Sequence, residues 1–294
     1  MINLSIRNGS ERISFPLSTV TYFHGKNYPL KYEYIKVIRK HFNKINHSDY
    51  DLENNTTTNI YIDNDEINLR NWNYFEIDTK FDFDSQFKLR SKSLMLQYLE
   101  SVLVNIEYDD TVSTINILFD DLTKAINEKI ELGNSEFSID AKLEELTLKS
   151  LLKLIELNII KEESLATEYN LTYTEYVLTQ IRLIKKVAKT NELKNNLVLV
   201  QLPYYDETII DELKCDLENL YFIVVNEDNE IDAKREEVIY FGKQITPLYD
   251  DVELYNKIML EHGVITTLEE LNSVVNDFLK NIDNEITKIL KENL

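Results

Sequence analysis

Apolar and polar residues alternate at the start of the chain, over residues 2–7 and 12–15. The pair Asn8-Gly9 lies between these segments, and Asn-Gly is the strongest short signal for a two-residue hairpin turn. Residues 20–23 are β-branched or aromatic, which is typical of a buried strand. The following segment repeats its apolar residues at helical spacing, at Ile35, Ile38, Phe42 and Ile45. The pattern therefore predicts a hairpin, a buried strand and a helix.

The next part of the chain mixes strand and helix patterns. Residues 46–59 are polar and rich in Asn and Thr, which predicts a loop. Strands are predicted near residues 60–62 and 73–77, and helices over 91–104 and 112–130.

The second half begins with a long segment, residues 138–194, that contains no glycine or proline. This segment is predicted to form two or three long helices. The continuous apolar segments 197–200 and 221–225 are typical of strands buried on both faces, and residues 207–218 between them are predicted helical. A strand–helix–strand unit of this length, about 30 residues, is the size of a parallel crossover. The chain is therefore predicted to be an α/β protein with a helical tail beyond Pro247.

The predicted domain organisation has a head, a leg and an extension. The α/β head is expected to comprise residues 1–137 and 196–245, with an α-helical leg at 138–195 and a helical C-terminal extension at 246–294. No apolar segment approaches the roughly 18 residues that a membrane span needs. The single cysteine, Cys215, cannot form an internal disulfide, which is typical of a reducing compartment. We therefore expect a cytoplasmic protein that does not associate with a membrane.

The junction between the strand at 20–23 and the next helix has the spacing of a phosphate-binding loop. Gly25 precedes Lys31 by six positions. However, Leu30 replaces the second glycine of that motif, and Tyr32 replaces the Ser or Thr that holds Mg²⁺. After the strand at 197–200 no carboxylate occurs until Asp206. The head is thus predicted to be a degenerate phosphate-loop-type fold that binds no nucleotide, or an ordinary strand–turn–helix; neither is expected to be an enzyme.

The charge balance is strongly acidic, with 52 Asp and Glu against 32 Lys and Arg, a formal net charge of −20. Duplex DNA repels a net anion over about one Debye length, so the protein as a whole is not expected to be coated in nucleic acid. The basic residues are nevertheless clustered. Residues 26–44 contain six Lys or Arg and one acid, and residues 182–194 contain five and one.

Each basic cluster forms a stripe along one predicted helix face. The first stripe has residues at i, i+4 and i+8 with one neighbour, namely Lys36, Lys40, Lys44 and Arg39. The second stripe consists of Arg182, Lys185, Lys186 and Lys189. It is accompanied by a predicted buried stripe of Val177, Ile181, Ile184 and Ala188. These stripes are typical either of surfaces that bind a phosphate backbone or of the ordinary solvated faces of two amphipathic helices.

The order of these elements resembles a known family in four blocks of sequence. The blocks are MINLSIRNGSERISFPLSTVTYF, then FDFDSQFKLRSKSLMLQYLESVL, then FSIDAKLEELTLKSLLKLIELNIIK continuing through TEYVLTQIRLIKKVAKTNELKNNLVLVQLPYYDE, and finally LYFIVVNEDN. They resemble the ring-forming adaptation accessory proteins of type II-A CRISPR systems, which bind the ends of double-stranded DNA. The resemblance covers roughly residues 1–245 as pattern and scattered identity, because the family has no short invariant motif. The tail at 246–294 has no counterpart in its shorter members.

The resemblance implies a protein that binds DNA and performs no chemistry. The family has a phosphate-loop-like head without ATPase activity, and it assembles as a homotetrameric ring whose basic interior encircles DNA. It binds calcium and works with the CRISPR integrase and effector nuclease during spacer acquisition. By this resemblance, DNA contacts fall on Lys36, Arg39, Lys40, Arg182, Lys185, Lys186 and Lys189. The calcium ligands fall on Asp140, Glu144 and Glu145.

Two other functions fit the same sequence. The first is an acidic scaffold with a degenerate NTPase core that binds only other proteins, with the basic faces left as interface or solvent surface. The second is an active nucleotide hydrolase with an unusual loop that uses Lys31.

Overall fold

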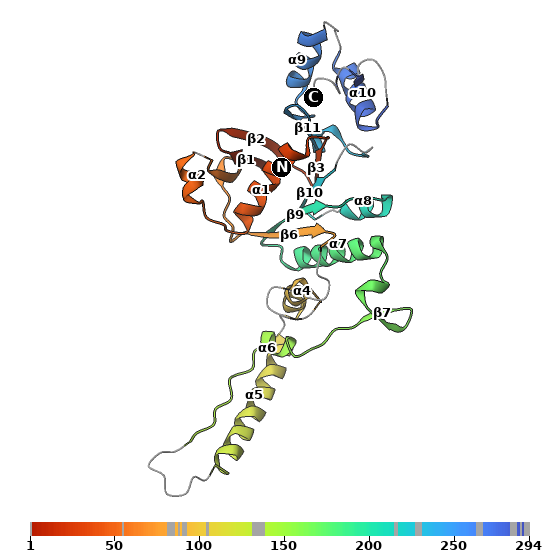
Figure 1. Ribbon diagram of the computed structural model, residues 1–294. Helices are drawn as coiled ribbons and strands as arrows, with labels where there is room; N and C mark the ends of the chain where they lie inside the picture. The colour runs from red at the N-terminus through yellow and green to blue at the C-terminus, as the bar shows by residue number, and fades with distance from the viewer. Residues whose placement is uncertain are drawn as a thin grey trace. The chain divides into compact units, whose positions relative to one another are not determined.

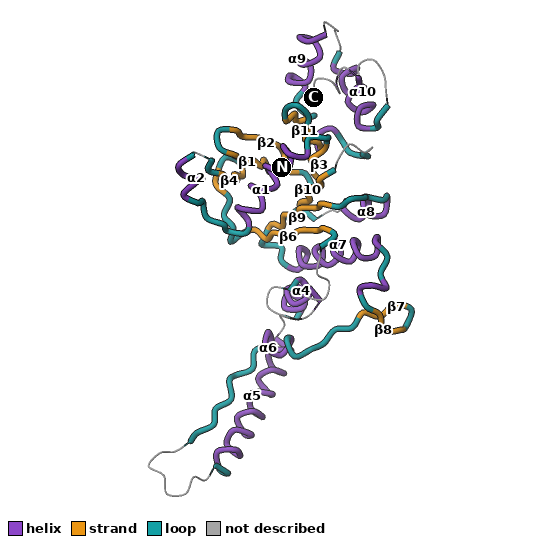
Figure 2. The backbone as a smooth tube through the Cα atoms, in the orientation of Figure 1, coloured by secondary structure: helices purple, strands orange, loops and turns teal. Residues whose placement is uncertain are grey.

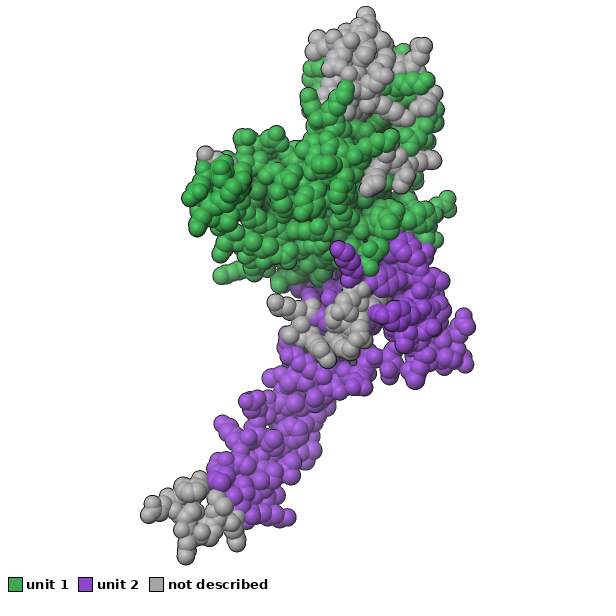
Figure 3. Space-filling view, viewed as in Figure 1, with its two compact units in different colours: residues 1–79, 192–294 green, residues 80–191 purple. Residues whose placement is uncertain are grey.

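The computed structural model describes residues 2–54, 56–80, 86–87, 89, 93–103, 106–130, 139–214, 217–226, 231–262, 267–282, 287–288 and 290 (Figure 1). The chain divides into two compact units, the first formed by residues 1–79 and 192–294 and the second by residues 80–191 (Figure 3). The second unit begins earlier than the predicted leg and includes the helices predicted over 91–104 and 112–130. The C-terminal extension belongs to the first unit.

The first unit contains a six-stranded sheet with the order β12-β11-β3-β10-β9-β6. Its strands are β3 (Val20–His24), β6 (Trp72–Asp78), β9 (Asn195–Gln201), β10 (Leu220–Val225), β11 (Val238–Phe241) and β12 (Ile245–Pro247). All neighbours pair in parallel except β11 and β12. The crossover from β9 through α8 (Glu207–Leu213) to β10 confirms the predicted strand–helix–strand unit. The chain is therefore an α/β protein.

A smaller antiparallel sheet in the same unit has the order β2-β1-β4-β5. It consists of β1 (Ile2–Asn8), β2 (Glu11–Leu17), β4 (Thr58–Ile62) and β5 (Asp65–Glu66). The predicted hairpin is confirmed, but its two loop residues are Gly9 and Ser10, because Asn8 is the last residue of β1 and pairs with Glu11. Gly9 has a positive φ of 61°, as the first loop residue of a type II′ turn requires. The predicted polar loop before β4 contains a short helix, α2 (Asp49–Glu53).

Helix α1 (Tyr28–Phe42) supplies the central part of the core between these two sheets (Figure 2). Its buried Ile35 and Ile38 belong to one apolar cluster with residues of both sheets. From the small sheet come Leu4, Ile6 and Ile60, and from the large sheet come Phe23, Leu199, Ile223 and Phe241. The prediction that Ile45 continues the buried face is wrong, because α1 ends at Phe42 and leaves Ile45 59% exposed.

The C-terminal helices α9 (Asp251–His262) and α10 (Leu268–Leu279) are tied to the first unit by a buried arginine. Arg235, in the short helix η2 (Arg235–Glu237), donates to the Leu248 carbonyl at 3.1 Å. It also donates to Asn272 Oδ1 on α10 and to Asp251 Oδ1 on α9. One guanidinium therefore links both helices to the segment that leads into β11.

The second unit is mainly helical but is less so than predicted. It contains α4 (Leu94–Val102), α5 (Ile106–Asn127), α6 (Leu148–Leu152), β7 (Ile159–Lys161), β8 (Ser164–Ala166), η1 (Glu168–Asn170) and α7 (Tyr173–Thr190). Helices α4 and α5 confirm the helices predicted over 91–104 and 112–130. The prediction of long helices over 138–194 is wrong for residues 139–172, where α6 is the longest helix; residue 138 lies outside the described residues. Among the helices that the structure describes, none combines the length and apolar character that crossing a bilayer requires.

Two features account for the absence of long helices in that segment. The first is the β7–β8 hairpin, whose two-residue turn places Glu162 and Glu163 at φ of 49° and 63°. Positive φ at both positions is the geometry of a type I′ turn, which Asn and Gly normally occupy. A Glu-Glu pair therefore gave no turn signal.

The second feature is a pair of asparagines on α5 that hold residues 141–146 extended. Asn116 donates to the Leu146 carbonyl at 2.9 Å and accepts from the Leu146 N–H at 2.8 Å. Asn127 makes the same two bonds with Ala141, at 3.0 and 2.7 Å. Eleven helical residues rise about 16.5 Å, and five extended residues span about the same length. The side-chain amides thus hold this segment as an extended strap along α5.

Candidate nucleic-acid interface

The turn between β3 and α1, where the phosphate-loop spacing occurs, is anchored to the end of β11. Gly25 has a φ of 112°, and a Cβ at this position would lie 2.5 Å from the Phe241 carbonyl oxygen. The Asn27 N–H donates to the same oxygen at 3.1 Å, and Asn27 Nδ2 donates to the Gly242 carbonyl at 2.7 Å. Asn27 Oδ1 accepts from the Leu30 N–H at 3.1 Å and caps α1. The turn therefore requires a glycine for packing against β11.

Lys31 is completely buried beneath this turn. Its Nζ donates to the Gly25 carbonyl at 2.5 Å and to the Asn226 carbonyl, just after β10, at 2.8 Å. In nucleotide-hydrolysing phosphate loops the equivalent lysine reaches the β- and γ-phosphates. Here its ammonium supports the turn from inside.

The strand end that holds the metal-binding carboxylate in NTPases carries Gln201 in this chain. Gln201 Nε2 lies 2.7 Å from Tyr28 Oη, and its Oε1 accepts from Arg39 Nη2 at 3.3 Å. Asp206, the first carboxylate after β9, caps α8 by accepting from the Ile209 N–H at 2.8 Å. At the carboxyl end of β9, Gln201 and Asp206 therefore form hydrogen bonds within the protein.

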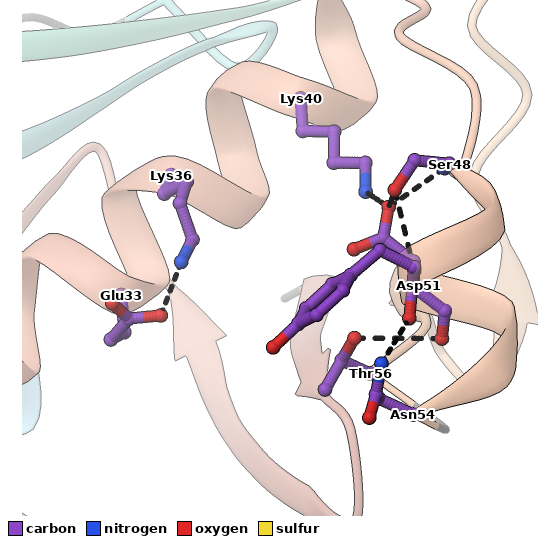
Figure 4. A network of polar contacts seen from close by, with 8 residues as sticks. Glu33, Lys36, Lys40, Ser48, Asp51, Asn54 and Thr56 are labelled. Carbon is purple, nitrogen blue, oxygen red and sulfur yellow. Dashed lines mark hydrogen bonds and ion pairs between the residues drawn. The ribbon is translucent and has the colours of Figure 1, made fainter.

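Three of the four residues of the first basic stripe lie on α1 and are paired with acidic residues (Figure 4). The fourth, Lys44, lies beyond the end of α1 at Phe42 with a φ of 57°, so it does not continue the predicted helix face. Lys36 lies 2.5 Å from Glu33 on the same helix. Lys40 lies 2.6 Å from Asp51 of α2, and both side chains are largely buried. Arg39, which Figure 4 does not draw, donates to Glu76 Oε2 from Nε at 3.0 Å and from Nη2 at 2.7 Å.

Asp51 is held ionised by its surroundings. Hydrogen bonding from Lys40 is the largest cause that moves the pKa of Asp51 well below its usual range. The backbone N–H and the hydroxyl of Ser48 add to this effect, and the hydroxyl lies 2.9 Å from Asp51 Oδ2. The three predicted DNA contacts on α1 therefore have their charge balanced within the first unit.

Helix α7, in the second unit, has a start and a buried face that its sequence encodes. Thr172 accepts from the Glu175 N–H at 3.2 Å, while the Thr172 N–H donates to Glu175 Oε2 at 2.8 Å. This reciprocal pair is a capping box, which satisfies two backbone donors at the helix start. The predicted buried stripe is confirmed, because the four side chains at Val177, Ile181, Ile184 and Ala188 are all inaccessible to solvent.

The basic stripe of α7 lies on the other side of this helix. Arg182, Lys186 and Lys189 are exposed, and Lys185 is half-buried. Lys186 Nζ lies 5.3 Å from the centre of the Tyr98 ring on α4. A ring contact of this kind positions the ammonium without neutralising it. In the part of the chain that the structure describes, neither Lys186 nor Lys189 forms an ion pair.

The structure thus distinguishes two stripes that look alike in sequence. The partners of the α1 stripe, Glu76 and Asp51, are 37 and 11 residues away along the chain from Arg39 and Lys40. The contribution of Tyr98 beneath Lys186 was also missed, because it comes from a different helix. No local sequence signal could have found these contacts.

The predicted calcium ligands are exposed and do not form a ligand cluster. Asp140 accepts from Asn127 Nδ2 at 2.7 Å, beside the strap along α5. Glu144 and Glu145 lie on the strap itself, which has no helical structure. Within the described ranges, no three His, Cys, Asp or Glu side chains are placed to hold a metal ion. Calcium binding stays a prediction.

Comparisons with known proteins support the fold. No family model and no curated protein matches the chain. Its structure is similar to the crystal structure of Stu0660 of Streptococcus thermophilus, with a TM-score of 0.75 and 18% sequence identity. The match covers 99% of this chain and 93% of that chain, so the C-terminal helices are part of the shared fold.

Proposed function

We propose that this chain is a non-catalytic protein that binds double-stranded DNA ends without regard to sequence, through the basic face of α7. The observation that carries the proposal is that Lys186 and Lys189 stay exposed, with no ion pair among the described residues, in a protein of net charge −20. Local positive charge on an acidic protein concentrates binding at one surface, because the remaining surface repels the phosphates.

The mechanism that follows is phosphate binding with release of counterions. Each lysine that contacts a phosphate displaces a condensed cation from the duplex, so affinity falls as salt rises. Contacts of this type position a protein on DNA without reading the bases. The α1 stripe is expected to contribute little, since binding DNA there requires breaking the ion pairs of Lys36, Arg39 and Lys40.

The resemblance to the type II-A CRISPR adaptation accessory proteins supports a more specific role. On that basis we propose a homotetrameric ring that encircles the duplex, is steadied by calcium, and acts with the integrase and effector nuclease in spacer acquisition. A degenerate phosphate-loop-type head fits this role, because the buried Lys31 and the anchored turn at Gly25 serve packing.

The test compares linear and covalently closed circular DNA of one sequence, bound at increasing salt with and without calcium. A ring loads from free ends, so the linear form is expected to be retained at salt concentrations that remove the circle. The solution mass, measured in the same buffers, is expected to be that of a tetramer. Equal retention of both forms contradicts encirclement, and no binding of either contradicts the proposal as a whole.

A second candidate, a scaffold that binds other proteins, is favoured by one specific observation. The α5 side chains Ile117 and Leu118 are both 62% exposed, and Leu122 is 52% exposed. Exposed apolar residues grouped on one helix are typical of a protein-binding surface. This candidate is supported if the protein binds no DNA at any salt concentration and charge reversal on α7 does not alter that result.

A further inference from the structure

A cleft of about 720 Å³ lies in the first unit beside the start of β3. Its wall includes Tyr22 of β3, Lys214 at the end of α8, Lys234 before η2 and Lys280 at the end of α10. Ligand-binding clefts for small molecules are typically about 300–1,000 Å³. The size of this cleft therefore suits a small organic ligand.

The cleft is separate from the phosphate-loop turn. Thr19 and Val20 line it at the amino end of β3, whereas Gly25 follows the carboxyl end of the same strand. Gly25 lies five residues after Val20, which is about 16 Å along an extended chain. The buried Lys31 and its turn therefore play no part in this cleft.

Part of the cleft lining is basic. Three lysines reach it from three different elements of an acidic protein. Lys234 and Lys280 make no ion pair with any residue that the structure places. Lys214 is shared between Asp232 at 3.4 Å and Asp211 at 3.6 Å, which are long contacts at an exposed site. Lys234 and Lys280 can therefore bind a phosphate without breaking an ion pair with a described residue, whereas Lys214 must exchange its contacts with Asp232 and Asp211.

Hydrogen-bond acceptors line the cleft among these lysines. Asp232 and Glu237 line the cleft together with the Tyr22 side chain, which is only 4% exposed. Burial raises the pKa of Tyr22 above its ordinary value, and the negative charges of Glu237 and Asp232 raise it further. The phenol thus stays protonated beside two carboxylates. Carboxylates accept hydrogen bonds from sugar hydroxyls, as in dinucleotide sites where an acid binds the ribose.

We propose that this cleft binds the ribose-phosphate part of a small ribonucleotide. Lys214, Lys234 and Lys280 bind the phosphate, and Asp232 and Glu237 accept from the ribose hydroxyls. The inference is independent of DNA binding by α7, because it concerns side chains of the first unit only.

Isothermal titration calorimetry with four probes tests the inference. The probes are adenosine 5′-monophosphate, its 2′-deoxy form, adenosine and inorganic phosphate. We expect the ribonucleotide to bind most tightly and the 2′-deoxy form about tenfold more weakly, because one hydrogen bond to a carboxylate is lost. Adenosine and inorganic phosphate each lack half of the recognised group and are expected to bind more weakly still.

Three variants assign the site. Lys280→Glu is expected to weaken ribonucleotide binding at least tenfold, and Glu237→Gln is expected to reduce the preference over the 2′-deoxy form. Lys153→Glu, an exposed lysine of the second unit, is the charge-matched control and is expected to bind as the unaltered protein does. Urea unfolding of each variant shows whether it is folded.

Three outcomes overturn the proposal. They are no heat of binding for the ribonucleotide in the millimolar range, equal binding of inorganic phosphate and the ribonucleotide, and equal affinity of the Lys280→Glu and Lys153→Glu proteins for it. If Lys280→Glu instead weakens duplex binding and leaves the nucleotide unaffected, the lysines serve DNA and the nucleotide site is wrong.

Discussion

Replacing Lys31 by methionine tests whether this lysine is a structural residue of the β3–α1 turn. Methionine keeps most of the side-chain length but removes the ammonium group, so it leaves little cavity. The carbonyls of Gly25 and Asn226 then lose the donor that lies 2.5 and 2.8 Å away.

The size of the effect follows from those two acceptors. A buried polar group left without its hydrogen bond costs about 1–3 kcal/mol, so two carbonyls set a range of about 2–6 kcal/mol. Removing the buried ammonium also removes the cost of its desolvation, which offsets part of this loss. We therefore expect the first unit to lose about 2–3 kcal/mol of unfolding free energy.

Tryptophan fluorescence during urea unfolding is the assay, because it reports the correct unit. The single tryptophan, Trp72, is buried in the same apolar cluster as α1 and lies in the first unit. Lys36→Met, on the exposed face of the same helix, is the matched control and is expected to change stability by less than about 0.5 kcal/mol. An unchanged unfolding midpoint for Lys31→Met refutes the structural role. Stabilisation of the unaltered protein by a nucleoside triphosphate that disappears in Lys31→Met restores the hydrolase alternative.

Three further predictions address other parts of the chain. Gly25→Ala places a Cβ 2.5 Å from the Phe241 oxygen at a φ of 112°, and is expected to destabilise the first unit by about 2–4 kcal/mol in the same fluorescence assay; wild-type stability contradicts the packing argument. Asn116→Ala removes two hydrogen bonds to the strap along α5 and is expected to speed tryptic cleavage at Lys142 without moving the tryptophan transition; an equal cleavage rate argues against the strap. A hydrogen bond from Lys161 Nζ, 2.8 Å from Glu175 Oε2, is the main cause that lowers the pKa of Glu175 from 4.5 to about 2. Because the folded pKa is depressed, the stabilisation is present above about pH 4.5 and is lost as the pH falls towards 2. Thermal unfolding followed by circular dichroism should therefore show a flatter acid limb for Glu175→Gln, and identical pH profiles contradict the assignment.

Most of the first unit could be predicted from sequence because its elements are encoded locally. The β1–β2 hairpin has a glycine in its two-residue turn, and β9 and β10 are continuous apolar segments. The second unit could not be predicted as well, since its signals are non-local or atypical. The β7–β8 turn uses Glu162 and Glu163 at positive φ, and the strap depends on asparagines on a separate helix.

The candidate interface also depends on contacts that sequence spacing could not predict. Sequence spacing placed Lys40 and Lys186 in equivalent stripes, and nothing in either stripe distinguishes them. The difference lies in the partners, because Lys40 pairs with Asp51 whereas Lys186 lies over the Tyr98 ring. A charge pattern therefore identifies candidate helix faces, and only tertiary contacts show which face keeps its charge.

The most direct test of DNA binding through α7 is the salt dependence of affinity for a blunt linear duplex. The comparison uses the unaltered protein, Lys186→Glu/Lys189→Glu, and a control with the same change in net charge, Lys36→Glu/Lys129→Glu. The slope of log K against log salt is expected to fall by about 2 for the α7 variant and by much less for the control. Equal slopes for the two variants, or no binding by the unaltered protein, contradict the assignment of DNA binding to α7.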